Sequence, residues 1–223
     1  MRARAASPGE ACRTARRGDA SNHVVPHPNV FPNSAESLMS PVKILAIPGS
    51  LRRASFNRAL ARAAAELAPA GTEVEITDLR DIPVYDDDVQ TAGMPLAVAA
   101  LQARIAAADA VFIATPEYNH GVPGVLKTAI DWTSRGGRQP WKGKPVAIAG
   151  ASNGGFGTVR AQLALRPTLG CLDARVLANP QVHVSFAQDK IDAEGHVHDE
   201  KTRASLAQLL AALVAAVPEP RPV

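Results

Sequence analysis

Apolar residues along the chain occur in short runs, separated by longer segments of helical periodicity, from residue 42 onward. Three runs are almost wholly apolar, which is typical of strands buried on both faces of a sheet: VKILAI at 42–47, ADAVFIAT at 108–115 and PVAIAGAS at 145–152. In EVEITDL at 73–79, polar residues alternate with apolar ones, which predicts a strand near the edge of the sheet. ARVLA at 174–178 predicts a fifth strand.

The segments between these runs repeat apolar residues every three or four positions, which is the spacing of one face of a helix. The predicted helices cover residues 55–68, 95–107, 124–134, 159–170 and 201–217. Ser55 is a suitable N-cap for the first helix, whereas Pro167 would kink or interrupt the fourth. Five strands separated by helices predict one parallel sheet with helices on both faces, a three-layer α/β domain.

The first forty residues carry arginine, serine, proline and asparagine without any period, which is typical of disorder. We therefore expect a disordered N-terminal extension over residues 1–40 and a single domain over residues 41–219. Met39 directly precedes the first apolar run, so one explanation is that translation starts there. An unstructured appendage and an organellar transit peptide are the alternatives, and Glu10 and Asp19 weaken the second of these.

Charge and cysteine content exclude several classes of function. The formal net charge is +3, and five arginines and three acids before residue 39 account for +2 of it. A nearly neutral domain remains, without the basic surface that binds nucleic acid or anionic membranes. No apolar run is long enough to span a membrane, so a cytoplasmic protein is expected. Cys12 and Cys171 do not have the spacing of a metal site or a disulfide framework, and Cys171 is expected to be a small buried residue.

The turn after the first strand, PGSLRRASFN at 48–57, predicts a phosphate site, because ligands of such sheets bind at the carboxyl ends of the strands. Its candidate binding residues are one turn-forming glycine and four donors: Gly49, Ser50, Arg52, Ser55 and Asn57. The helix behind the turn adds free N–H groups and the positive end of its dipole. A Walker A loop and a G-x-G-x-x-G fingerprint are both absent, which favours a terminal monophosphate. An ordinary helix cap with solvated arginines is the alternative.

The loop after the second apolar run, TPEYNHGVPG at 115–124, is suited to a flat ring. Its prolines stiffen the loop, and its glycines let a planar ligand approach the backbone. The candidate residues are Pro116, Glu117, Tyr118, Asn119 and Gly121. Main-chain groups there can bind a planar heterocycle, and Tyr118 offers an aromatic face. A rigid loop that caps the next helix is the alternative.

The loop after the third apolar run, AGASNGGFG at 149–157, can line the far side of the same crevice through Ser152, Asn153 and Gly154. A generic glycine turn explains this loop equally well. Taken together, one loop suits a phosphate and two suit a flat ring. This combination predicts a mononucleotide across the carboxyl end of the sheet, and flavin mononucleotide (FMN) fits best.

At these residues the chain resembles the NADPH-dependent FMN reductase family. The resemblance rests on GSLRRASFN at 49–57, PEYNHGVPGVLKTAIDW at 116–132 and GASNGGFGTVRAQ at 150–162, and it extends from about residue 42 to about residue 217. It implies a flavodoxin-like sandwich with a five-stranded parallel sheet of order 2-1-3-4-5, tightly bound FMN, and a homodimer or homotetramer. By similarity, the donors of the first turn would hold the FMN phosphate and the other two loops would flank the isoalloxazine.

The resemblance also implies a reaction: NADPH passes hydride to N5 of FMN, and the electrons continue to a quinone, an azo compound, a metal oxyanion or free flavin. No metal and no protein acid or base are expected, since a helix position and a loop position explain Asp131 and His120 more simply. Arg52 and Arg53 are candidates to contact the 2′-phosphate of NADPH. The alternative is a flavodoxin-like single-electron carrier with a protein partner. The nearly neutral domain, with Tyr118 as the main aromatic residue of these loops, favours an enzyme.

Overall fold

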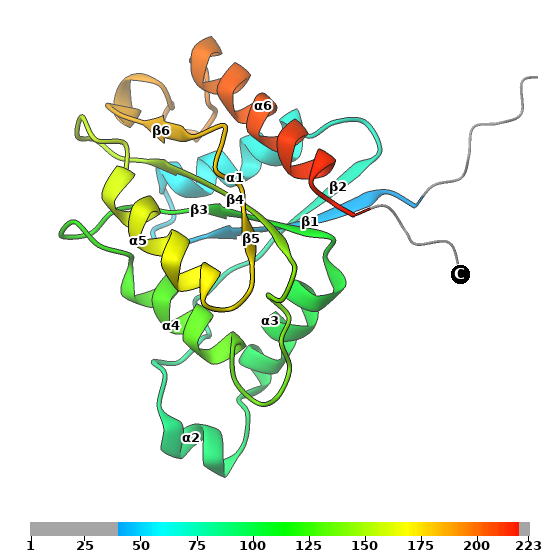
Figure 1. Ribbon diagram of the computed structural model, residues 1–223. Coiled ribbons are helices and arrows are strands. Elements are labelled where there is room, and N and C mark those ends of the chain that lie inside the picture. Colours follow the sequence, from blue (N-terminus) through cyan, green and yellow to red (C-terminus); the bar gives the residue numbers. More distant parts are fainter. Residues whose placement is uncertain (1–39, 219–223) are drawn as a thin grey trace, which may run out of the picture. The chain divides into compact units, whose positions relative to one another are not determined.

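The computed structural model describes residues 40–218, and these form one parallel sheet between two layers of helices (Figure 1). The strands are β1 (Val42–Pro48), β2 (Thr72–Ile76), β3 (Ala110–Ala114), β4 (Pro145–Ala151), β5 (Arg175–Val176) and β6 (Val182–Val184). Their order is β2-β1-β3-β4-β5, all parallel, with β6 also paired to β4. The predicted order 2-1-3-4-5 is confirmed. The predicted extension lies outside the described residues, except for residue 40.

The fifth strand position differs from the prediction of one strand over residues 174–178. Two short strands share it: β5 pairs with the start of β4 (Pro145↔Arg175), and β6 pairs with its end (Ala151↔Val184). The segment between them contains Pro180, which has no backbone N–H to donate to a ladder. The sheet therefore has six strands at five positions.

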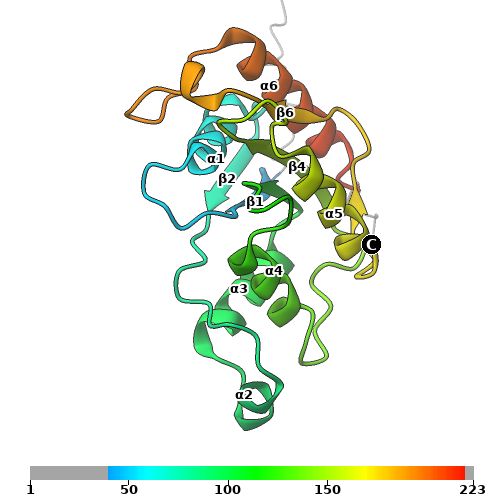
Figure 2. The same ribbon diagram turned by 90° about the vertical axis from the view of Figure 1, so that its left-hand side faces the viewer.

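The helices divide between the two faces of the sheet (Figures 1 and 2). They are α1 (Phe56–Leu67), α2 (Asp87–Ala92), α3 (Leu96–Ala107), α4 (Gly124–Thr133), α5 (Val159–Gly170), the 3₁₀ turn η1 (Ala187–Asp189) and α6 (Glu200–Ala215). α1 and α6 pack on one face, where Ile44 and Ala46 of β1 point, and α3, α4 and α5 pack on the other, where Leu45 and Ile47 point. Alternate side chains of one buried strand thus serve two cores.

Two expectations for α5 can be compared with the structure. The helix continues through Pro167 to Gly170 and is not interrupted. Cys171, expected to be buried, is exposed: it is the C-cap of α5, and Leu169, two positions earlier, fills the core instead. The α2 segment was not predicted, because its six residues include none that is buried and so carry no apolar period.

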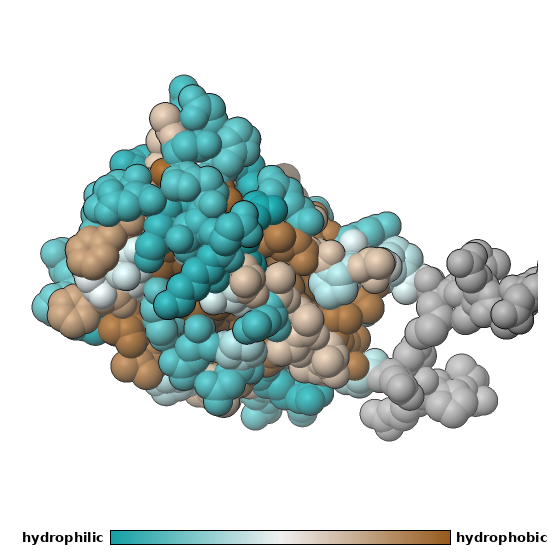
Figure 3. Space-filling model, turned by 90° about the horizontal axis from the view of Figure 1, so that it is seen from above, coloured by the Kyte–Doolittle hydropathy of each residue, from teal (hydrophilic) through white to brown (hydrophobic). Residues whose placement is uncertain are grey.

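Seen from the side of α6 and β6, the surface is mainly hydrophilic, with hydrophobic residues exposed between the hydrophilic areas (Figure 3). Across residues 40–218, no helix combines the length and the apolar character that crossing a bilayer requires.

Candidate functional site

Three loops meet at the carboxyl end of the sheet, because neighbouring strands end together there. Pro48 of β1 is paired with Ala114 of β3, and Ala114 is paired with Ala149 of β4. The loops that follow these strands enclose a cavity of about 440 Å³. It is lined by Ser50, Arg52, Ser55, Phe56, Asn57, Pro116, Glu117, Tyr118, Ala151, Ser152, Asn153 and Gly154. Ten of the thirteen residues proposed from sequence are therefore brought to one cavity.

Three sequence candidates do not line this cavity, namely Gly49, Asn119 and Gly121. Gly49 has a different role: a Cβ there would lie 2.9 Å from Leu126 Cδ2 and 3.3 Å from Pro116 Cδ. This position admits only glycine without a shift of its neighbours, and it lets the first two loops pack closely. The lining residues Phe56 and Ala151 were not proposed from sequence, although both adjoin residues that were.

The β1–α1 turn presents hydroxyl and backbone donors to the cavity. Ser50 and Ser55 are buried, and Ser55 Oγ accepts from Asn57 N at 3.2 Å as the N-cap of α1. The Ser55 hydroxyl only accepts in this bond and keeps its own proton for donation to a ligand, whereas the Ser50 hydroxyl shares a hydrogen bond with the Tyr118 hydroxyl. Among the described residues, no oxygen accepts a hydrogen bond from the backbone N–H of Arg53 or Ala54. Hydroxyls, free N–H groups and a helix N-terminus together form a donor set that fits a phosphate.

Asn57 connects this turn to the end of β4. Its Nδ2 donates to Ala151 O at 2.9 Å, and Ala151 N donates to its Oδ1 at 2.9 Å, in a buried setting. The side chain was proposed as a phosphate donor, but the structure uses both ends of its amide to bind the backbone of another loop. Asn57 is therefore placed to hold the first and third loops together.

Glu117 makes a corresponding connection between the second loop and α5. Its carboxylate accepts from Arg160 Nη1 at 2.8 Å, from Arg160 N at 2.9 Å and from Ala161 N at 3.2 Å. Burial alone would raise the pKa of Glu117, but these hydrogen bonds, with the Arg160 side chain foremost, hold that pKa below its ordinary value. The carboxylate is thus ionised at neutral pH and caps the N-terminus of α5.

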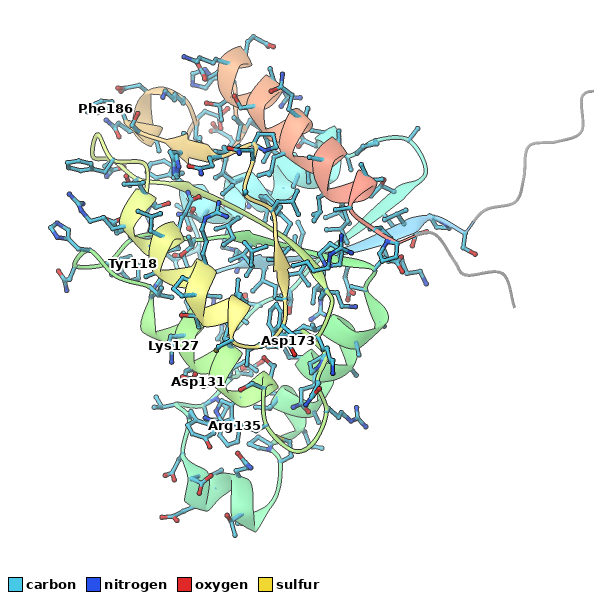
Figure 4. All side chains as sticks on the ribbon, viewed as in Figure 1. Tyr118, Lys127, Asp131, Arg135, Asp173 and Phe186 are labelled. Carbon is cyan, nitrogen blue, oxygen red and sulfur yellow. The ribbon has the colours of Figure 1, made fainter. Side chains whose placement is uncertain are left out.

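The second loop is a tight turn with an exposed tip. Tyr118 and Gly121 exchange both backbone hydrogen bonds, at 3.2 and 3.0 Å, around Asn119 and His120, which adopt φ of +48° and +64°. Tyr118 projects from the side of the molecule above α4 (Figure 4), and its hydroxyl lies 3.3 Å from Ser50 Oγ. The phenol therefore reaches the β1–α1 turn while half of the side chain stays in solvent.

The third loop is held by β6 and the segment after it. Ser152 N donates to Val184 O at 3.0 Å, Ala187 N donates to Ser152 O at 3.0 Å, and Phe186 N donates to Gly154 O at 3.3 Å. The exposed Phe186 lies on the same side of the molecule as Tyr118 in Figure 4. Sequence reasoning missed Phe186 because β6 itself was not predicted. The exposed Asn153 and Gly154 leave main-chain groups at the mouth of the cavity.

The donor set determines which chemistry the site can support. Among residues 40–218, no group of His, Cys, Asp and Glu is arranged to hold a metal ion. Asp131 is bound by Lys127 Nζ at 2.8 Å along α4 and does not line the cavity. A cavity with hydroxyl donors at one end and stiffened backbone turns on both sides fits a phosphate joined to a flat ring. The residues present therefore fit FMN.

Comparisons with known proteins agree with this geometry. The family model for NADPH-dependent FMN reductase matches residues 42–189. An NAD(P)H-dependent FMN reductase of Pseudomonas aeruginosa is 49% identical over 172 residues, covering 77% of this chain and 93% of the relative. A quinone reductase of Escherichia coli K12 is 46% identical over 164 residues, covering 72% and 87% of the two chains.

Among solved structures, the flavoenzyme NAD(P)H:(acceptor) oxidoreductase FerB of Paracoccus denitrificans superimposes with a TM-score of 0.72 at 36% sequence identity. The match covers 78% of this chain and 96% of FerB. The family model spans the three cavity loops, and the relatives align over most of their own length. The chain therefore belongs to the NADPH-dependent FMN reductase family.

Proposed function

We propose that the cavity at the carboxyl end of the sheet is an FMN site and that the chain uses it to reduce quinones with NAD(P)H. Membership of the family makes the chain an NAD(P)H-dependent flavin oxidoreductase with FMN as its cofactor. The observation that carries the assignment of the site is the convergence of three loops on one cavity, with phosphate donors at one end.

In this proposal Ser50, Ser55 and Arg52 bind the FMN phosphate, together with the N-terminus of α1. Two buried hydroxyls and a guanidinium supply hydrogen bonds and charge without a metal ion. Main-chain groups of residues 116–121 and 152–154 flank the ring. Asn57 and Glu117 act indirectly, because their side chains bind other loops.

Bound FMN would supply the hydride chemistry, so the role of the protein is to bind the cofactor, orient its ring and shield the ring from water. No side chain is needed as an acid or base: Asp131 is paired with Lys127, and His120 is exposed at the loop tip. The exposed Asn153 and Gly154 leave the mouth of the cavity accessible to a second planar molecule.

A quinone is the acceptor class that the relatives favour. The names of three relatives support it: the Escherichia coli quinone reductase, a Pseudomonas putida quinone reductase at 39% identity and a 2-hydroxy-1,4-benzoquinone reductase of Burkholderia at 42% identity. Azo compounds, metal oxyanions and free flavin are the other acceptors to compare. The single-electron carrier is not favoured, because these relatives are named as enzymes.

We further propose that the protein is a cytoplasmic homodimer or homotetramer. Support comes from the exposed apolar side chains on or beside the cavity loops, Tyr118, Phe156 and Phe186, since exposed apolar patches mark association surfaces. Light scattering after gel filtration measures the oligomeric state, and cell fractionation measures the location. A monomer at micromolar concentration contradicts the first statement.

The experiment is a visible spectrum of the purified protein, before and after NADPH is added without air, followed by steady-state turnover with benzoquinone. A bound flavin that bleaches, and turnover without any added protein, are expected. A flavin that stays oxidised with both NADPH and NADH contradicts the proposal.

Substitutions in the β1–α1 turn test whether this turn binds the FMN phosphate. Arg52→Ala and Ser55→Ala are expected to weaken FMN binding about 10-fold or more each, since each loses a hydrogen bond to a charged group. Arg138→Ala removes one exposed guanidinium between α4 and the start of β4, before the amino end of that strand, and serves as the matched control. Equal FMN dissociation constants for all four proteins would show that the phosphate binds elsewhere.

A further inference from the structure

A second, larger cavity adjoins the FMN cavity and is used by nothing described so far. Its volume is about 590 Å³, within the range of roughly 300–1,000 Å³ typical of small-molecule sites. It shares Arg52, Ser55 and Phe56 with the first cavity, so the β1–α1 turn is a common wall. The two cavities therefore meet at Arg52.

The other walls are α1 and the hairpin that follows η1, residues 191–197, which lie side by side (Figure 2). Arg62 Nη2 of α1 donates to Gly195 O at 3.3 Å, and Ile191 and Val197 form an antiparallel bridge that closes the hairpin. The buried Ile191 anchors the hairpin in the core. The cavity is therefore built by ordered elements.

Three arginines line this cavity: Arg52, Arg53 and Arg62. Within residues 40–218, none of the three has a carboxylate within 4 Å. Three guanidiniums without acidic partners, each carrying a rigid fork of N–H donors, form a site suited to a phosphate.

Two acids also line the cavity, and they leave these guanidiniums free. Asp192 is engaged within the hairpin, where it accepts from His196 N at 2.7 Å and lies 3.1 Å from His196 Nδ1. Glu194 is exposed, and neither acid pairs with the three arginines. The remaining wall combines the polar Ser55 and Gln188 with apolar side chains. Ala59, Ile191, Ala193 and Phe56, whose ring centroid lies 5.5 Å from the Arg52 guanidinium, offer a surface on which a flat base can pack.

We propose that this cavity binds the adenosine end of NADPH, with Arg53 and Arg62 holding its 2′-phosphate. The inference rests on the proposed function, because it takes the first cavity to hold FMN and the nicotinamide to stack at its mouth. NADPH is a dinucleotide, so its second half must extend beyond the flavin cavity, and the shared wall at Arg52 leads into this one. Only NADPH carries the 2′-phosphate, so these arginines set the preference for NADPH over NADH.

The test is calorimetric titration of the FMN-loaded protein with adenosine 2′,5′-bisphosphate and, separately, with 5′-AMP. FMN occupies the first phosphate site, so binding reports the second cavity, and no turnover is needed. The bisphosphate is expected to bind about 10-fold or more tightly than 5′-AMP, as one phosphate with charged hydrogen bonds implies. Equal affinities for the two compounds would overturn the inference.

Arg53→Ala and Arg62→Ala are each expected to weaken the bisphosphate about 10-fold and to leave 5′-AMP unchanged. Arg53 has no side-chain hydrogen bond among the described residues, so its variant tests the charge without disturbing the hairpin. Arg138→Ala, which removes the same charge before the amino end of β4, is expected to leave both affinities unchanged. An equal loss for Arg138→Ala would indicate a general charge effect and would overturn the assignment.

Steady-state kinetics distinguish a failure of this inference from a failure of the proposed function. In the Arg53 and Arg62 variants, KM for NADPH is expected to rise about 10-fold while kcat and all parameters for NADH stay unchanged. An unchanged ratio of NADPH to NADH kcat/KM would sink the inference and leave the flavin enzyme standing. Failure of both nucleotides to reduce the flavin would instead sink the proposed function.

Discussion

Asn57 links two loops of the cavity through the two ends of one side-chain amide. It exchanges two hydrogen bonds with the backbone of Ala151, and the side chain is 2% exposed. Removing it leaves a buried N–H and a buried C=O without partners, and each such group costs about 1–3 kcal/mol.

Asn57→Ala is therefore expected to lower the free energy of unfolding by about 3 kcal/mol in urea titration of the FMN-free protein. Asn153→Ala removes an exposed amide on the same cavity and should change it by less than about 0.5 kcal/mol. If Asn57→Ala keeps full stability and loses only FMN affinity, then the amide is a phosphate ligand and not a link between loops.

Glu117 is expected to make stability depend on acid. Its folded-state pKa lies below the ordinary value of 4.5, so its contribution to stability is fully present above pH 4.5 and is lost as the pH falls through the folded pKa. Glu117→Gln should lower the melting temperature at pH 7, and the difference from the unmodified protein should shrink below about pH 4. Glu66→Gln breaks an exposed ion pair with Arg203 and is the control with little effect at any pH. A gap of constant size from pH 7 to pH 3 would contradict this account.

At this scale, the sequence predicted which residues meet but not what each side chain does. The positions of Ser50, Ser55, Tyr118 and Asn153 at the ends of strands were enough to place them at one cavity. The roles of Asn57 and Glu117 depend on partners 94 and 43 residues away along the chain, at Ala151 and Arg160. The type of a side chain does not show which partner it binds when a ligand and a distant backbone group could both accept its hydrogen bond.

At the scale of elements, the packing of β4 requires the segments that contain Thr115 and Thr158 to lie close to its backbone at Gly150. A Cβ on Gly150 would overlap the Thr158 hydroxyl and the Thr115 carbonyl oxygen, and both of these threonines are fully buried. A glycine inside a buried strand is thus required by the loops on either side of it.

Gly150→Ala is expected to destabilise the protein by about 3 kcal/mol or more and to reduce FMN content on purification. Gly170→Ala, at the end of α5, meets nothing within 4 Å and should be neutral or stabilising by up to about 1 kcal/mol. Urea unfolding of both variants measures the contrast. Equal stabilities would mean that the third loop can move aside at no cost.

Periodicity predicted the long elements well and the short ones poorly. The helix predicted over 159–170 matches α5, and 124–134 matches α4 to within one residue, because each offers three turns of pattern. β5 and β6 are two and three residues long, too short for any period to be read. Their existence depends on pairing with β4, which is a tertiary contact.

At the scale of the whole molecule, both cores and the cavity are built from residues within 40–218. A chain that starts at Met39 is therefore expected to bind FMN with the same affinity as the full chain and to melt within about 2 °C of it. Fluorescence titration and differential scanning calorimetry measure the two quantities. A large loss in either would show that the first 38 residues contribute to the domain, contrary to the predicted boundary.

The divided fifth strand position also bears on how the protein avoids aggregation. Long, flat sheet edges invite strands of other molecules, and proteins block them with short strands, prolines and charges. Here one edge consists of two short strands separated by a segment containing Pro180, and the other, β2, carries Glu73 and Glu75, with Glu75 paired to Arg104 at 2.8 Å. One edge is thus interrupted, and the other is short and carries charged side chains. We therefore expect any contact between copies of this chain to use helices and loops rather than strand pairing.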